Sequence, residues 1–131
     1  MVKSFLLASI LLFVGIFQSA AMSSKKWDSL YDGAIDAYRA GVHELVEINF
    51  NLLLEEAVRQ GNTRDELAFL LHLSEARRAS GQLEASYKTL QNAKHLISTS
   101  ENRHHKLIAR YYNRSAAVYY EIKELDSSLY F

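Results

Sequence analysis

Histidine is the side chain best suited to acid–base or metal chemistry near neutral pH, and the chain has five histidines. They are His43, His72, His95, His104 and His105. The segment from His43 to Glu47 begins like the HExxH motif of zinc proteases but lacks the second histidine. His104 and His105 could touch a metal together with His95, but no spacing of carboxylates completes a ligand set. The sequence therefore predicts no metal site, and solvated residues at a helix start are the favoured interpretation of His104-His105.

Other motifs of catalytic or cofactor sites are missing from the sequence. None of the patterns GxxxxGK[ST], GxGxxG or GxSxG occurs. The absence of cysteine excludes disulfides, thiolate metal sites and cysteine nucleophiles. With 15 Lys+Arg against 15 Asp+Glu, the chain lacks the excess of cations that nucleic-acid binding requires. We therefore expect a protein that is not an enzyme, with no catalytic residues, no small-molecule cofactor and no nucleic-acid partner.

The segment 1–21 has the pattern of a signal peptide for export. Lys3 supplies a positive charge, the run from Phe5 to Phe17 is largely apolar, and Ser19-Ala20-Ala21 offers small residues for a signal peptidase. A membrane-spanning helix needs about 20 apolar residues, so a cleaved signal is favoured over the alternative, an uncleaved anchor. We expect cleavage after Ala21 and a mature chain of 22–131. Export without cysteine is typical of a bacterial periplasm, so the expected location is periplasmic or secreted.

The residues that follow the signal have the pattern of helices joined by short turns. The sequence contains no proline, which helix interiors tolerate poorly, and glycines 41, 61 and 81 divide its apolar periodicity. Ser23-Ser24 is expected to cap the first helix, and Thr63 with Glu66 to form a capping box. The expected helices are 24–40, 42–60, 63–80, 83–97 and 104–122, followed by a turn at Lys123-Glu124 and the start of a sixth helix at 125–131.

Apolar residues predict how these helices pack. Helix 42–60 has too many of them for one stripe, so we expect it to be covered on two sides. A connection as short as the one at Gly81 makes neighbouring helices antiparallel. Tyr111, Tyr112 and Tyr119 follow helical spacing and are expected in the core. The sequence thus predicts an all-α fold of antiparallel helix hairpins at about 24–61, 63–98 and 103–131, the last one truncated.

Two stretches of the chain resemble each other when one is shifted along the sequence onto the other. A shift of 42 places Leu83 on Leu125 and Ser86 on Ser128, and a shift of 41 places Ser74 on Ser115. The repeat period is therefore about 41–42 residues, with two helices per unit. This pattern resembles the tetratricopeptide repeat, in its long MalT-like variant. The matching residues are Leu70, Leu73, Ser74, Gly81, Leu83, Ser86, Leu90 and Ala93 in the second unit, and Tyr112, Ala116, Tyr119, Leu125 and Ser128 in the third.

The chain departs from the family pattern at three points. Arg77 stands at a consensus tyrosine, Lys123 replaces the turn glycine, and the closing proline is missing from every unit. A generic array of helical hairpins is therefore the alternative to a tetratricopeptide fold.

The resemblance implies a right-handed α-solenoid whose first helices line a concave groove for a peptide or a partner helix. The groove positions carried over from the family are Leu71, Glu75, Arg78, Arg110, Asn113 and Tyr120. Arginine and asparagine on a helix can also be simply solvated, which is the alternative interpretation. The expected function is a non-catalytic protein–protein interaction module of an exported protein. The alternative is the extracytoplasmic sensor region of a membrane-bound histidine kinase or transcriptional regulator. We also expect the natural protein to continue beyond Phe131, where a membrane tether could lie.

Overall fold

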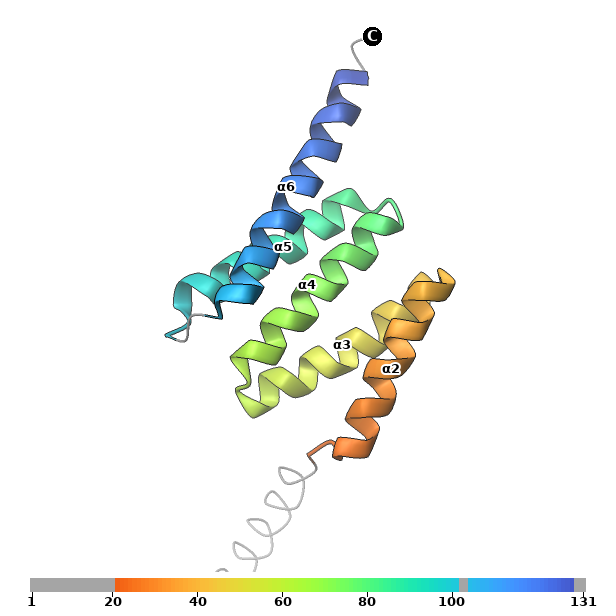
Figure 1. Cartoon of the computed structure of the whole chain (residues 1–131), viewed down its shortest axis with the longest axis vertical. Helices are drawn as coiled ribbons and strands as arrows, with labels where there is room; N and C mark the ends of the chain where they lie inside the picture. The colour runs from red at the N-terminus through yellow and green to blue at the C-terminus, as the bar shows by residue number, and fades with distance from the viewer. Residues whose placement is uncertain (1–20, 102–103, 129–131) are drawn as a thin grey trace, which may run out of the picture.

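The computed structural model describes residues 21–101 and 104–128, which form helices and no strand over these ranges (Figure 1). The helices are α2 (Ser24–Ala40), α3 (His43–Gln60), α4 (Thr63–Ala79), α5 (Leu83–Thr99) and α6 (His105–Ser128). The prediction of an all-α fold is confirmed. Two predictions lie outside the described residues, namely the apolar export segment within 1–20 and the chain end at 129–131.

The predicted ends of the first helices are confirmed. The hydroxyl of Ser23 accepts a hydrogen bond from the backbone N–H of Lys26 at 3.2 Å, which caps α2. Gly41 and Gly61 end α2 and α3 with φ of 74° and 64°, in the left-handed region that glycine adopts at little cost. These turns are short, and Figure 1 shows the helices on either side of each running in opposite directions.

The predicted capping box at the start of α4 is wrong by one residue. Asn62 is the cap: its Oδ1 accepts from the backbone N–H of Asp65 at 3.1 Å, and its Nδ2 donates to Asp65 Oδ2 at 2.8 Å. Asparagine is a stronger N-cap than threonine, so the helix begins at the earlier residue. Thr63 is the first helical residue instead of the cap.

The predicted turn at Lys123-Glu124 is also wrong. Helix α6 continues through both residues to Ser128 as a single helix of 24 residues. Lysine and glutamate favour the helix interior, and no glycine stands here to adopt the positive φ seen at Gly41, Gly61 and Gly81. The hairpin expected at 103–131 therefore does not form within residues 105–128.

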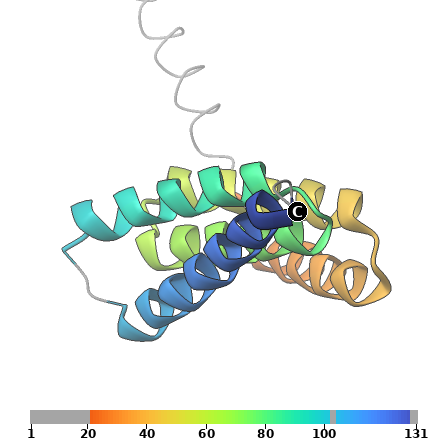
Figure 2. The same cartoon turned by 90° about the horizontal axis from the view of Figure 1, so that it is seen from above.

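The helices lie in two layers, with α2, α4 and α6 in one and α3 and α5 in the other (Figure 2). Helix α4 is central and contacts α3, α5 and α6. Helix α3 contacts both α2 and α4, so the prediction that it is covered on two sides is confirmed. Since consecutive helices alternate in direction, α2, α4 and α6 run the same way and bring their N-terminal ends to one end of the fold (Figure 1).

Two clusters of buried side chains hold the layers together. The first joins Ala34 of α2, Phe50 of α3 and Phe69 of α4, which are at most 3% exposed. The second joins α4, α5 and α6 and includes Leu90 and Val118. Small residues allow the close approach of α4 and α5, because Ser86 is fully buried and its hydroxyl donates to the carbonyl of Ser74 at 2.6 Å.

The three tyrosines expected in the core have different environments. Tyr111 is 7% exposed and belongs to the second cluster, but Tyr112 and Tyr119 are 65% and 55% exposed, so the prediction is wrong for these two. Helix α6 packs on α4 and α5 with one face; Tyr112 is exposed, and Tyr119 lies at the edge of that face, where its ring meets Tyr87 of α5 edge-on with the centroids 5.7 Å apart. Within the described ranges, no helix combines the length and apolar character needed to span a membrane.

Candidate binding cleft

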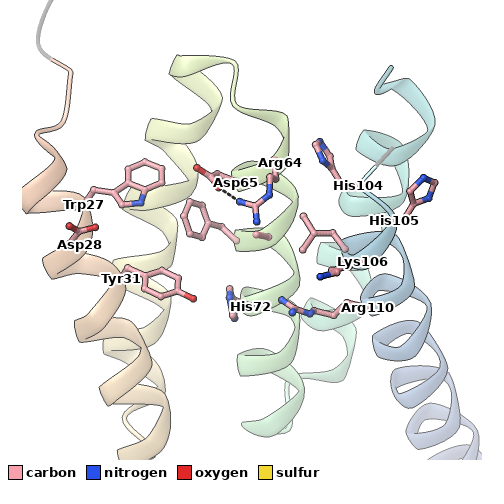
Figure 3. A pocket seen from close by; sticks show the side chains of 13 residues that line it. Trp27, Asp28, Tyr31, Arg64, Asp65, His72, His104, His105, Lys106 and Arg110 are labelled. Carbon is pink, nitrogen blue, oxygen red and sulfur yellow. Dashed lines mark hydrogen bonds and ion pairs between the residues drawn. The ribbon is translucent and has the colours of Figure 1, made fainter. Parts of the chain in front are cut away.

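A cleft of about 670 Å³ lies between α2, α4 and α6, near their N-terminal ends (Figure 3). Its lining combines aromatic side chains with cationic ones. The lining residues are Trp27, Asp28, Tyr31, Arg64, Asp65, Ala68, Phe69, His72, His104, His105, Lys106, Leu107 and Arg110. Residues four apart on a helix share a face, which explains the series Arg64, Ala68 and His72 on α4 and the pair Lys106 and Arg110 on α6.

One wall of the cleft is aromatic. Trp27 and Tyr31 lie one turn apart on α2 and point toward α4 (Figure 3). There their rings meet Phe69. The ring centroids are 5.3 Å apart for Trp27 and Phe69 and 6.4 Å apart for Tyr31 and Phe69. Tilted pairs at these distances are favourable aromatic contacts. The wall therefore offers a preformed apolar surface to a ligand.

His72 lies where the aromatic wall meets the cationic side. Its imidazole stacks on Phe50 and meets Tyr31 edge-on, with centroids 4.8 Å and 6.0 Å away. Burial, together with the positive charges of Arg110 and Arg114, lowers the pKa of His72 to about 4. The ring is thus neutral near pH 7 and acts as a further flat surface. A general base for neutral pH would need a pKa closer to 7.

The opposite side of the cleft carries cations with few partners. Arg64 approaches Asp65 at 3.5 Å, and Asp65 is also held by Asn62. The side chains of Lys106 and Arg110 on α6 form no hydrogen bond or ion pair with any described residue, and Arg110 extends toward His72 (Figure 3). The Nε2 atom of His104 is buried without a hydrogen-bond partner among the described residues. The side chains of Lys106 and Arg110 therefore offer unpaired donors to a ligand in the cleft.

The groove positions predicted from the repeat family lie in different places. Arg110 lines the cleft. Asn113 and Tyr120 are exposed on α6 and do not line it. Leu71 is 1% exposed in the core between α4, α5 and α6, so its assignment to an open groove is wrong. Leu71 belongs to the buried cluster that joins α4, α5 and α6, although Ala68, three positions before it, lines the cleft.

Glu75 and Arg78, the other two predicted groove residues, join α4 to α6. Arg78 donates to both carboxylate oxygens of Glu75 at 2.9 Å and 2.7 Å, and also to Glu121 of α6. Arg114 of α6 reaches Glu75 at 3.0 Å. The carboxylate of Glu75 is therefore occupied by partners within the chain.

The ion pairs between Glu75, Arg78, Arg114 and Glu121 shift the pKa values of Glu75 and Arg78. Burial acts to raise the pKa of Glu75, but the hydrogen bonds from Arg78 and the charges of Arg114 and Arg78 outweigh it and hold the pKa below its usual value. Hydrogen bonds to Glu75 and Glu121 raise the pKa of Arg78. Both shifts favour the charged forms of Glu75 and Arg78, and the ion pairs of these two residues with Arg114 and Glu121 hold α6 beside α4.

Sequence reasoning missed the aromatic wall and most of the cationic side. Three of the family positions, Glu75, Arg78 and Tyr120, lie in the C-terminal halves of α4 and α6, whereas the cleft lies near the N-terminal ends of these helices. A signal was present in the spacing of four between Trp27 and Tyr31 and between Lys106 and Arg110. Because residues four apart in a helix lie on the same face, the two members of each pair are expected to point the same way.

No known family, curated protein or solved structure matches this chain. In residues 21–101 and 104–128, no three side chains of histidine, aspartate or glutamate gather closely enough to hold a metal ion.

Proposed function

We propose that this chain is a non-catalytic interaction module that binds a peptide segment in the cleft between α2, α4 and α6. The observation that carries the proposal is the pairing of the Trp27–Tyr31–Phe69 wall with the uncommitted cations Lys106 and Arg110. The segment that fits has an apolar or aromatic side chain next to a carboxylate. It is bound as an extended strand or as one face of a partner helix.

The chemistry of each side of the cleft supports this choice of ligand. A carboxylate beside Lys106 and Arg110 would gain charge-assisted hydrogen bonds, which are shorter and stronger than those between neutral groups. An aromatic or aliphatic side chain would bury its surface against Trp27 and Tyr31. The volume of about 670 Å³ is within the range of ordinary ligand pockets, about 300–1,000 Å³.

A tetratricopeptide-like, right-handed solenoid is the architecture that we propose for the helices. The repeat spacing of the sequence supports it, as does the placement of α2, α4 and α6 in one layer (Figure 2). The buried contact between Ser74 and Ser86 supports it further, because both are small residues of the repeat pattern. We also propose an exported, periplasmic or secreted protein, on the strength of the signal-like segment 1–21.

A selection from a random peptide library, displayed on phage and run against the purified protein, tests the proposed function. We expect enrichment of peptides that combine aspartate or glutamate with an aromatic or large aliphatic residue. The enriched peptides should bind Arg110→Glu at least about tenfold more weakly, the factor that corresponds to about 1.4 kcal/mol.

The matched control is Arg39→Glu, because Arg39 is exposed at the end of α2 and does not line the cleft. Its affinity for the enriched peptides should equal that of the wild type. Enrichment of basic peptides, or equal weakening by both substitutions, would contradict the proposal.

A further inference from the structure

The start of the described chain is held by a buried carboxylate. The backbone N–H of Met22 donates to Oε1 of Glu56 at 3.0 Å, across 34 positions of sequence. The side chain of Glu56 lies on α3 and is 1% exposed. Met22 packs against the first core cluster, and Ser23, the next residue, caps α2. This contact therefore fixes the point at which the chain enters the fold.

The remaining partners of Glu56 are one neutral donor and one cation whose side chain is largely exposed. Gln60 donates a neutral hydrogen bond at 3.0 Å. Arg59 donates a charged one, but its side chain is 64% exposed. The largest influence on this carboxylate is the N–H of Met22, which lowers the pKa of Glu56 against the opposing effect of burial. A buried carboxylate is costly unless it is well paired, so this site favours a cation at the Met22 nitrogen.

The same nitrogen belongs to the bond at which the sequence predicts cleavage. Ser19-Ala20-Ala21 has the small residues that a signal peptidase requires, and Ala21 is exposed next to the folded part of the chain. We propose that hydrolysis of the Ala21–Met22 bond creates an α-ammonium group that pairs with the buried carboxylate of Glu56. This inference rests on the proposed export signal but is independent of the ligand of the cleft.

The chemistry of the step is ordinary peptide hydrolysis by a signal peptidase, with water as co-reactant. The carbon–nitrogen bond between Ala21 and Met22 breaks. The carbonyl carbon of Ala21 takes the hydroxyl of water and becomes a carboxylate. The nitrogen of Met22 takes up protons and becomes –NH₃⁺. One neutral donor facing Glu56 is thereby replaced by a charged group with three donors, which strengthens the hydrogen bond that the structure shows.

Processing of the full chain tests the first half of this proposal. The chain is expressed with its N-terminal segment in a bacterial host that exports it, and the product is analysed by mass spectrometry. We expect Met22 as its first residue. A product that begins at any other residue would overturn the proposal.

The titration of the new N-terminus tests the second half. An α-amino group ordinarily has a pKa of about 7.7–8.0, and pairing with Glu56 should raise this value by about one unit or more in the processed protein. The pKa is measured by NMR of ¹⁵N-labelled protein, in the wild type, in Glu56→Gln and in Glu55→Gln. Glu55 is the matched control because it neighbours Glu56 on α3 but is exposed.

We expect the raised pKa in the wild type and in Glu55→Gln, and the ordinary value in Glu56→Gln. If Glu56→Gln does not fold, the other two proteins decide the question. An ordinary pKa in the wild type would overturn the proposal, whereas weak peptide binding in the cleft would leave this result unaffected.

Discussion

The imidazole of His72 lies parallel to the ring of Phe50, with the centroids 4.8 Å apart and the planes inclined by 6°. His72 belongs to α4 and Phe50 to α3, while Tyr31 of α2 meets the same imidazole edge-on. A side chain of the cleft is therefore held in place by two neighbouring helices. This contact couples the shape of the binding surface to the packing of the first core cluster.

The buried position of His72 predicts a loss of stability in acid. Its folded-state pKa of about 4 lies below the ordinary value of 6.5, so the unfolded chain takes up the proton first as the pH falls. The stability that neutral His72 contributes is present above pH 6.5 and is lost progressively down to about pH 4. The loss amounts to roughly 3 kcal/mol.

Urea unfolding at neutral pH and at about pH 4.5 measures this effect. His72→Gln has no titrating ring, so its free energy of unfolding should fall less over this interval than that of the wild type. His95→Gln, at an exposed position of α5, serves as the control and should behave like the wild type. The same fall in His72→Gln and the wild type would show that His72 is not the group responsible.

The contact between α4 and α5 depends on a small residue at position 86. Ser86 is fully buried and donates to the carbonyl of Ser74. Ser86→Trp would overpack this contact and should lower the free energy of unfolding by about 1–3 kcal/mol or more. Ser98→Trp places the same side chain at an exposed position of α5 and should change the stability little. Equal stability of the two variants would be inconsistent with the packing described.

The ion-pair network around Arg78 predicts how firmly α6 is held. Arg78→Met would remove the link to Glu121 and leave Glu75, whose side chain is 11% exposed, with Arg114 and Tyr38 as its partners. We expect a loss of about 1–2 kcal/mol, less than for a fully buried pair because Arg78 is 27% exposed. Amide hydrogen exchange should become faster in α6.

Arg39→Met is the matched variant for this experiment, since Arg39 makes an exposed contact with Asp36 within α2. Its exchange rates in α6 should be those of the wild type. If Arg78→Met left these rates unchanged as well, the network would not be what holds α6 beside α4.

The helices up to α5 could be predicted from the sequence because their ends are determined locally. Gly41, Gly61 and Gly81 adopt positive φ, and Ser23 caps the helix that follows it. The end of α6 could not be predicted in the same way. Comparison of the repeats predicted a turn at Lys123, but lysine has a high helix propensity, and α6 continues through it to Ser128. At this point the helix propensity of the residues outweighed the pattern of the repeat, so a helix formed where the repeat predicted a turn.

The candidate site was predictable only in part. Arg110 was expected to face a ligand and lines the cleft. Leu71, Glu75 and Arg78 were assigned from the family pattern alone, which does not show that Leu71 is enclosed by α5 and α6 or that Arg78 has carboxylate partners on two helices. The contact of Arg78 with Glu121 and the enclosure of Leu71 arise between residues far apart in sequence, so no local spacing revealed them; only the pair of Glu75 and Arg78, three positions apart on α4, was visible locally.

The fluorescence of Trp27 provides the most direct measurement of binding in the cleft. The chain has one tryptophan, and it lines the aromatic wall. A synthetic peptide with glutamates flanking a phenylalanine should change the emission of Trp27 in a saturable way. The change should be lost in Arg110→Glu, retained in Arg39→Glu, and absent when lysines replace the glutamates of the peptide. Emission that stays constant up to about 1 mM acidic peptide, or that responds equally to the lysine peptide, would contradict the proposed function.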